Sequence, residues 1–259
     1  MAGPTHLLAA APPAVPGACV AGSYLLGTFP SARLAARHRG VDPTAAGSGN
    51  PGATNVYRTA GRRAGALTLA GDLFKGAAAA GVGWAVGGHE LGVACGVAAV
   101  VGHVAPIRWP VSDTGARLAG QGRRWRRPPP RQGAYPDSSS SLPATPLTRR
   151  YAHRIRYRPP RPLQGGKGVA TGAGMALVLF PLPALVSGAA FAAVTGLSRT
   201  VSLGSMAAVA VLPAAAGVLG APGREVAALA ACAVLVIARH RANIGRLWRG
   251  EEPRFGTAA

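Results

Sequence analysis

The sequence predicts an all-α, polytopic integral membrane protein with about seven transmembrane helices. Apolar residues make up 49% of the 259-residue chain and charged residues only 14%, whereas roughly 25% charged residues is usual in soluble domains. Three stretches carry no charged side chain, residues 7–32, 168–198 and 200–223. Each exceeds the roughly 20 residues with which a helix crosses the hydrocarbon core of a bilayer. The basic residues collect between such stretches.

Seven apolar runs define the predicted helices in chain order. The first does not read as a signal peptide, because no basic region precedes it and a cluster of arginines follows it directly. Only Pro181 and Pro183 separate the short fourth and fifth helices, so a single long, kinked helix is the alternative there. The predicted helices span residues 15–35, 65–87, 91–107, 168–181, 183–197, 201–219 and 225–239.

The basic residues also orient the predicted bundle. The connections after the first, third and seventh helices are rich in arginine, and the short one after the fifth holds Arg199. The N-terminus and the other connections hold one basic residue, Arg224. Loops rich in Lys and Arg face the cytoplasm. We therefore expect the N-terminus outside and the C-terminus in the cytoplasm. The net charge of +20 belongs to this pattern, and we expect membrane lipid rather than nucleic acid as a partner.

The chain divides into three parts. Residues 1–110 hold three helices and the first cytoplasmic loop, and residues 162–259 hold four helices and a cytoplasmic C-terminal motif. Between them, residues 111–161 are rich in Arg, Pro and Ser and poor in aliphatic residues. Such a segment cannot bury enough apolar surface to offset its ordering entropy. We expect a disordered cytoplasmic insertion, which either lies on anionic lipid headgroups or is simply tolerated.

The first candidate site is GSGNPGATNVYR, residues 47–58. Glycines let a backbone approach a ligand closely, and hydroxyl and amide side chains add hydrogen-bond donors. A loop of this kind that leads into a helix suits an anion, particularly phosphate, although an ordinary turn is the simpler alternative. Its candidate residues are Ser48, Gly49, Asn50, Gly52, Thr54, Asn55 and Arg58.

The second candidate site is GGKGVAT, residues 165–171, at the start of the fourth helix. It is not a P-loop, because glycine follows the lysine where Ser or Thr would bind magnesium. The chain has only two lysines, Lys75 and Lys167. A lysine among glycines at a helix N-terminus is a good phosphate contact. The candidate residues are Gly165, Gly166, Lys167 and Gly168.

The third candidate site follows the last helix, RHRANIGRLWRGEE, residues 239–252. His240 and Asn243 are three residues apart and share a face if the helix continues. Elsewhere, Asp72 and Lys75 have the spacing of an ion pair within the second helix. Glycines four residues apart predict close helix contacts, at Gly92 with Gly96 and Gly168 with Gly172.

Several chemistries find no support in the sequence. The cysteines Cys19, Cys95 and Cys232 have neither metal-ligand spacing nor a disulfide framework. No carboxylate dyad, zinc site or Ser-His-Asp order is evident, and no histidine precedes an acidic residue by the spacing of the common glycerolipid acyltransferases. The three glycine- and Asn-rich basic clusters, all predicted at one membrane face, indicate a site for a phosphorylated substrate.

Six motifs in order resemble the bacterial PlsY-type acyl-phosphate:glycerol-3-phosphate acyltransferases. They are GSYLLGTFPSARL, GSGNPGATNVYR, GDLFKG, GHVAP, GGKGVAT and RHRANIGRLWRGEE, and they span most of the chain. The resemblance implies acyl transfer from an acyl phosphate to the 1-hydroxyl of sn-glycerol 3-phosphate, giving 1-acyl-sn-glycerol 3-phosphate and phosphate in phospholipid synthesis. It implies a multi-pass protein of the bacterial cell membrane with a cytoplasmic active site and no metal or cofactor.

The resemblance also suggests roles for individual residues. Ser48, Arg58, Lys167, His240 and Asn243 are the expected catalytic residues, and the remaining candidates bind substrate together with Glu251, although Glu252 matches the acidic end of the motif equally well. Either His240 or a substrate phosphate takes the hydroxyl proton. The long stretch between GHVAP and GGKGVAT departs from the family pattern. An inactive relative or a membrane carrier of a phosphorylated metabolite is therefore the alternative function, and the sequence leaves the oligomeric state open.

Overall fold

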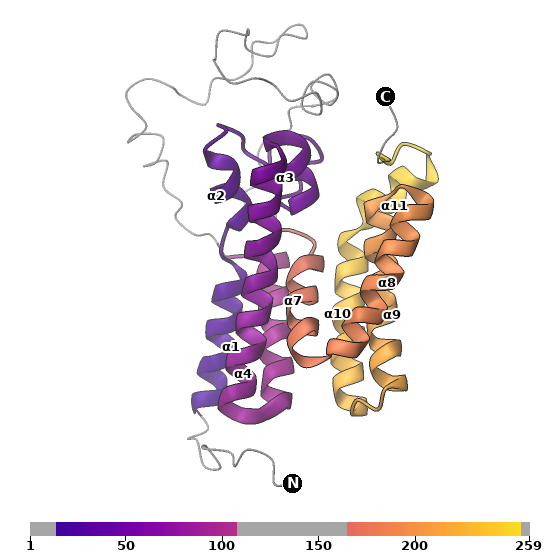
Figure 1. Ribbon diagram of the computed structural model, residues 1–259. Helices are drawn as coiled ribbons and strands as arrows, with labels where there is room; N and C mark the ends of the chain where they lie inside the picture. The colour runs from indigo at the N-terminus through magenta and orange to yellow at the C-terminus, as the bar shows by residue number, and fades with distance from the viewer. Residues whose placement is uncertain (1–13, 108–164, 255–259) are drawn as a thin grey trace, which may run out of the picture.

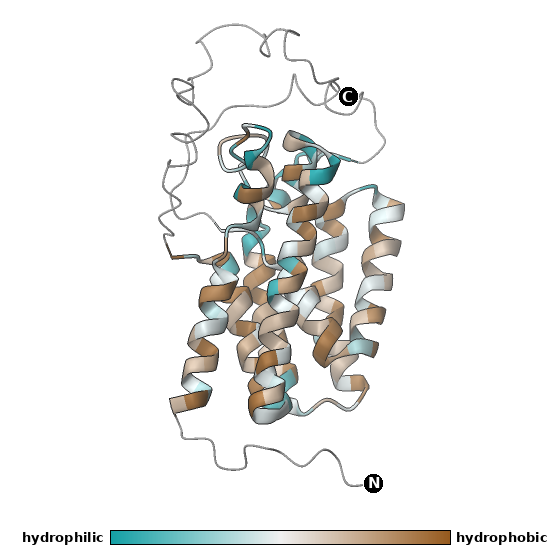
Figure 2. Ribbon diagram, turned by 60° about the vertical axis from the view of Figure 1, so that its left-hand side comes forward, coloured by the Kyte–Doolittle hydropathy of each residue, from teal (hydrophilic) through white to brown (hydrophobic). Residues whose placement is uncertain are grey.

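The computed structural model describes residues 14–107 and 165–254, and all regular secondary structure in these ranges is helical. The predicted all-α class is thus confirmed. The long helices run side by side, and three short helices gather at one end (Figure 1), called the polar end because hydrophilic residues collect there (Figure 2). The short helices are α2 (Ser31–Arg37), α3 (Ala53–Ala60) and α11 (Arg241–Trp248). The predicted insertion, residues 111–161, lies outside the described residues.

The first predicted helix is wrong in its extent. The apolar run forms α1 (Ala14–Gly27), after which the chain turns and begins α2 at Ser31. Pro30 accounts for this break, because proline has no backbone N–H to donate and its ring would clash with the preceding helical turn. As a result, α2 packs against the upper part of α4 and lies at the polar end of the molecule (Figure 1).

The second and third predicted helices are confirmed as two arms of one folded element, α4 (Arg62–Val104). Helical geometry breaks inside it at Gly87 and Gly88, and Gly88 has a φ of 78°, which glycine adopts without strain. The arms run back along each other, since a Cβ atom built on Gly83 would lie 2.7 Å from the carbonyl oxygen of Leu91. This hairpin forms the centre of the bundle.

The fourth and fifth predicted helices are separate, so a single kinked helix is excluded. The chain leaves α7 (Val169–Leu179) at Phe180 and reverses into α8 (Pro181–Ser198). The first of these packs on α4, whereas α8 packs mainly on α9 (Val201–Val218). The last long helix, α10 (Gly223–Arg239), joins the two groups because it contacts both α9 and α4.

Close contact between α4 and α7 depends on glycine. A Cβ atom on Gly76 would overlap the carbonyl oxygen of Thr171, and one on Gly174 would overlap that of Leu73. Backbones that approach this closely gain the van der Waals contact that holds helices together in lipid. Three of the predicted contact glycines, Gly92, Gly96 and Gly168, are also tightly packed, because an added Cβ atom would come within about 3 Å of a neighbouring segment. At Gly172 the added atom would make only an ordinary van der Waals contact, 3.8 Å from Val100.

Within residues 14–107 and 165–254, three helices are long and apolar enough to cross a membrane, namely α4, α8 and α9. The bent pair of α10 and α11 adds a fourth if it is one span. The apolar helix α7 has only 11 residues, about 16 Å at 1.5 Å per residue. Hydrophobic side chains cover the outside of the bundle, including Phe74 at 69% exposed and Leu185 at 64%. The structure therefore has the character of an integral membrane protein.

Replacing Gly76 by alanine is expected to lower the thermal unfolding midpoint of the detergent-solubilised protein. The added methyl group forces α4 away from α7, and overpacking of this kind costs about 1–3 kcal/mol, or roughly 5 °C for a chain of this size. The matched control is Gly81→Ala in the same helix, where a Cβ atom meets nothing within 4 Å. An equal midpoint in both variants would contradict the proposed close contact.

Candidate active site

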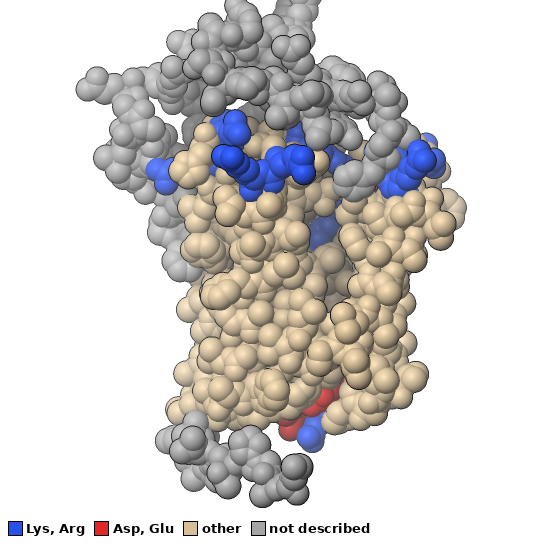
Figure 3. Space-filling view, in the orientation of Figure 1, with Lys and Arg blue, Asp and Glu red and all other residues tan. Residues whose placement is uncertain are grey.

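A cavity of about 1290 Å³ begins at the polar end and continues downward between α7 and the helices α8, α9 and α10. Figure 3 shows a hollow between the two halves of the molecule, with basic side chains near its upper part. The predicted residues that line the cavity are Ser48, Asn50, Gly52, Thr54, Asn55, Arg58, Lys167, Gly168, His240, Asn243 and Glu251. The predicted residues Gly49, Gly165 and Gly166 do not line it.

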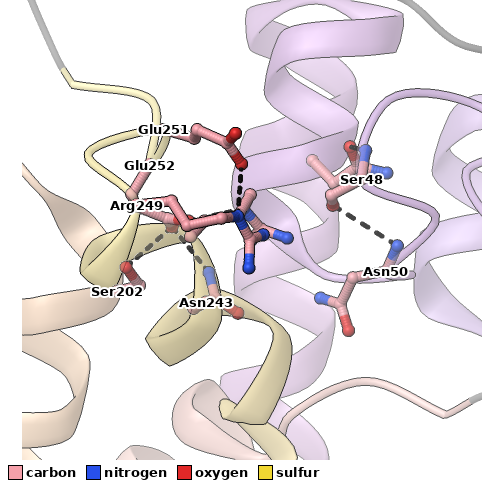
Figure 4. A network of polar contacts seen from close by, with 9 residues as sticks. Ser48, Asn50, Ser202, Asn243, Arg249, Glu251 and Glu252 are labelled. Atoms are coloured by element: carbon pink, nitrogen blue, oxygen red, sulfur yellow. Dashed lines mark hydrogen bonds and ion pairs between the residues drawn. The ribbon is translucent and has the colours of Figure 1, made fainter.

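The first candidate loop is held in shape by Asn55. Its buried side-chain amide donates to the carbonyl oxygens of Pro43 at 2.9 Å and Ala46 at 3.0 Å, and its Oδ1 accepts the backbone N–H of Ser48 at 2.9 Å. Both amide donors are therefore used within the protein. Asn55 shapes the loop, while Ser48 faces the cavity with other polar residues (Figure 4).

Four helices begin at this cavity. The first turns of α3, α7 and α9 line it, through Thr54, Ala170 and Ser202, and α11 contributes Asn243. None of these four N-termini has a side-chain cap hydrogen bond. Uncapped N–H groups and the positive end of the helix dipole both favour a bound anion. The folding of residues 53–60 into α3, where the sequence indicated a loop, adds one of these four ends.

The second candidate loop is tied to two helices. The backbone N–H of Gly166 donates to the carbonyl oxygen of His103 at 3.1 Å, and Arg239 donates to the carbonyl oxygen of Gly165 at 3.1 Å. Any larger residue at either glycine would overlap the end of α4, because a Cβ atom on Gly165 would meet the His103 carbonyl oxygen and one on Gly166 would meet its ring. Lys167 follows this fixed pair and reaches the cavity.

The ammonium group of Lys167 is largely buried and lies near several other cationic side chains. Burial lowers the pKa of Lys167 to about 8, the carboxylate of Glu252 opposes that change, and the guanidinium groups of Arg246, Arg58 and Arg239 reinforce it. A bound anion would relieve the repulsion among these cations. The cluster is therefore prepared for a negatively charged ligand.

Behind the loops lies a buried ion-pair network around Asp72. Its Oδ1 accepts hydrogen bonds from Ser31 Oγ at 2.5 Å and pairs with Lys75 Nζ at 2.9 Å, which confirms the predicted ion pair. Lys75 also donates to the carbonyl oxygen of Phe29 at 3.1 Å. His103 Nδ1 lies 3.6 Å from the same carboxylate oxygen. Both Asp72 and His103 line the cavity, although sequence reasoning gave neither a site role.

On the opposite wall, Glu252 holds three elements together. Its Oε1 accepts from Ser202 Oγ at 2.8 Å and Asn243 Nδ2 at 2.6 Å, and its Oε2 pairs with Arg246 Nε at 2.6 Å (Figure 4). Its side chain is 6% exposed, whereas that of Glu251 is 59% exposed and pairs with Arg249. Of the two acids that the motif left open, the structure puts Glu252 in contact with the predicted Asn243.

His240 stands at a break in the C-terminal motif. The helices α10 and α11 meet there at an angle of 56°, so the helix does not continue straight through His240, which was the condition for a helix face shared with Asn243. The imidazole is buried, and its Nδ1 lies 2.8 Å from the carbonyl oxygen of Val236. Because a carbonyl only accepts, Nδ1 carries the proton. The neutral ring therefore keeps Nε2 as an acceptor.

Sequence reasoning missed two residues of this wall. Ser202 gave no motif signal, and its position at the start of an uncharged helix on the predicted cytoplasmic side was the only hint. Arg246 was equally consistent with an interfacial anchor. Both face the cavity because the chain after α11 folds back, so that Glu252 lies beside α9. No group of three metal-ligating side chains occurs in the described part of the chain.

An apolar helical bundle with a basic cavity at one end is the arrangement of a membrane enzyme that acts on an anionic substrate. A family profile described as glycerol-3-phosphate acyltransferase matches residues 17–115 and 157–250. The glycerol-3-phosphate acyltransferase of Trichlorobacter lovleyi is 32% identical over 91% of this chain and 95% of its own length. That of Geobacter sulfurreducens is 34% identical over 90% and 94%.

A solved structure has the same fold. The crystal structure of PlsY (YgiH), described as an integral membrane glycerol 3-phosphate acyltransferase in its glycerol 3-phosphate form, matches with a TM-score of 0.70. It is 28% identical to this chain, with 93% of this chain and 96% of that chain covered. The lysophosphatidic acid form of the same protein matches with a TM-score of 0.69. The chain therefore belongs to the glycerol-3-phosphate acyltransferase family.

Glu252→Gln is expected to destabilise the protein, whereas Glu251→Gln is expected to be nearly neutral. The first change removes a buried acceptor of charge-assisted hydrogen bonds, worth about 2 kcal/mol, or roughly 5 °C in the unfolding midpoint. The second removes an exposed ion pair, which typically contributes less than about 1 kcal/mol. Thermal unfolding in detergent distinguishes them. Equal midpoints would show that Glu252 does not hold this wall together.

Proposed function

We propose that this protein transfers a fatty acyl group from an acyl phosphate to the 1-hydroxyl of sn-glycerol 3-phosphate, releasing 1-acyl-sn-glycerol 3-phosphate and phosphate. Family membership supports acylation of glycerol 3-phosphate in phospholipid synthesis. The donor is argued from one observation, a single cavity with cations and helix N-termini at one end and an apolar arm leading away from them. An acyl phosphate has the same two parts, an anionic head and an alkyl tail.

The polar end of the cavity would hold the phosphate groups. Arg58 of α3 and Lys167 of the second candidate loop line this end, and Arg246 lines the opposite wall, where it is already paired with Glu252. Fixed cations and N–H groups in a partly buried site stabilise developing negative charge more strongly than water does. The remaining predicted residues, Ser48, Asn50 and Thr54, add hydroxyl and amide groups for the glycerol hydroxyls and phosphate oxygens.

The reaction needs positioning more than bond activation, because phosphate is a good leaving group. The 1-hydroxyl oxygen attacks the acyl carbonyl carbon, the bond from that carbon to the phosphate oxygen breaks, and inorganic phosphate leaves. The hydroxyl proton passes to an acceptor within reach, which is His240 Nε2 or an oxygen of the bound substrate phosphate. The hydrogen bond from Nδ1 to Val236 keeps the imidazole in the form that can accept it.

The topology proposed for this enzyme has seven spans, formed by α1, the two arms of α4, α7, α8, α9 and α10. Among the described residues, arginines surround the polar end, while the opposite end carries Arg224 paired with Glu90 (Figure 3). The positive-inside rule then supports a cytoplasmic polar end and C-terminus and an outside N-terminus. The active site would thus face the cytoplasm from the bacterial inner membrane.

The direct test is acyl transfer from palmitoyl phosphate to labelled glycerol 3-phosphate by the purified full-length protein in detergent. Lysophosphatidate is expected from palmitoyl phosphate and not from palmitoyl-CoA. Lys167→Ala is expected to lower kcat/KM by roughly 10²–10³-fold, the usual effect of removing one charge-stabilising donor. Arg241→Ala, an exposed residue on α11 outside the cavity, should change it by less than about twofold.

Two outcomes would contradict this proposal. Product formed equally from palmitoyl-CoA would make the donor assignment wrong. No product from either donor, together with uptake of labelled glycerol 3-phosphate by proteoliposomes, would indicate a carrier instead of an enzyme.

The activity is also expected to fall on the alkaline side. With its pKa lowered to about 8, Lys167 is protonated at neutral pH and loses its charge as the pH rises through that value. The profile of kcat/KM for glycerol 3-phosphate reports groups of the free enzyme, so it should decline above about pH 8. In Lys167→Arg the guanidinium stays charged, and the decline should move to higher pH in whatever activity remains. An unchanged decline would assign it to another group.

A further inference from the structure

We propose that Gly188, Leu212 and Leu229 set the length of acyl chain that this protein accepts. The inference rests on the proposed acyl transfer and adds a specificity to it. The lower part of the cavity, here called the arm, leads away from the cations and continues between α7, α8, α9 and α10.

Small residues line much of this arm, beside larger apolar side chains such as Met175, Phe191 and Val209. Ala184 and Gly188 line it from α8, Ser205 and Ala208 from α9, and Ala233 from α10. Larger side chains at these positions would bring the helices' surfaces together and fill the space. The Oγ of Ser187 donates to the carbonyl oxygen of Ala208 at 2.6 Å, which fixes α8 against α9 at the level of Gly188.

The arm ends at two leucines. On α9 the cavity lining runs from Val201 to Leu212 and stops, and on α10 it stops at Leu229. Leu229 is 1% exposed and belongs to a hydrophobic cluster with Phe180 and Ala216, against which Leu212 also packs. From Ser202 to Leu212 the arm follows ten residues of helix, about 15 Å at 1.5 Å per residue. An acyl chain that enters from the cations therefore meets a closed floor.

Gly188 lies part of the way along this arm, and the space beside it is open. A Cβ atom built on Gly188 meets no atom within 4 Å, so a larger side chain there would occupy the arm without displacing a helix. Gly196, on the same helix, is equally open but does not line the cavity. Both glycines are exposed, and of the two only Gly188 lines the cavity. They form a matched pair for testing the inference.

The experiment measures kcat/KM for acyl phosphates from octanoyl to stearoyl with the full-length protein. Gly188→Leu is expected to lower the palmitoyl-to-octanoyl ratio by roughly tenfold, because the leucine displaces a few buried methylenes of the longer chain. Leu212→Ala is expected to raise the ratio of stearoyl to palmitoyl by a few-fold, because it lowers the floor. Gly196→Leu should leave both ratios within about twofold of wild type.

The possible results distinguish a failure of the proposed chain-length control from a failure of the proposed function. If the wild type is active and both ratios are unchanged in Gly188→Leu and in Leu212→Ala, the acyl chain leaves the arm sideways into lipid. That result would overturn the proposed control of chain length and leave the proposed function intact. A shift of the same size in Gly196→Leu would also overturn the proposed control of chain length, since that residue lies outside the cavity. A wild type that is inactive with every acyl phosphate would overturn both the proposed function and the proposed control of chain length.

Discussion

The buried carboxylate of Asp72 is the contact on which the arrangement of the polar end depends. A charge in an apolar bundle is costly unless it is paired and fully hydrogen-bonded. Here Lys75 neutralises it, Ser31 donates to it, and His103 lies beside it. These partners come from α2 and from both arms of α4. Asp72 therefore connects the helices next to the first candidate loop with the end of α4 that contacts Gly165 and Gly166.

The cavity combines two requirements that conflict in an ordinary protein core. A phosphate site needs positive charge and exposed N–H groups, whereas an alkyl chain needs an apolar, closed space. The bundle separates them along its axis. Four helix N-termini and the basic side chains lie at the polar end, while small residues on facing helices leave the arm below open. Burial and the nearby guanidinium groups lower the pKa of Lys167, and the carboxylate of Glu252 opposes that change.

The two walls of the site are stabilised independently. The wall that carries Ser48 is shaped by backbone contacts to Asn55, and the opposite wall by Glu252, which connects α9, α11 and the segment after it. The described contacts between the halves run mainly through α10 and through the apolar clusters beneath the cavity.

The sequence by itself determined the helical class, the positions of most long helices and the motifs that contribute to the site. Those features depend on local composition, since apolar runs, glycine spacing and basic clusters act over neighbouring residues. Only the tertiary structure decided that α2 is separate from α1, that residues 53–60 are helical and that Ser202, Asp72 and His103 line the cavity. It also placed Glu252, rather than Glu251, against Asn243. These outcomes rest on contacts between residues far apart in the chain, such as Ser202 with Glu252 and Ser31 with Asp72, which no local pattern encodes.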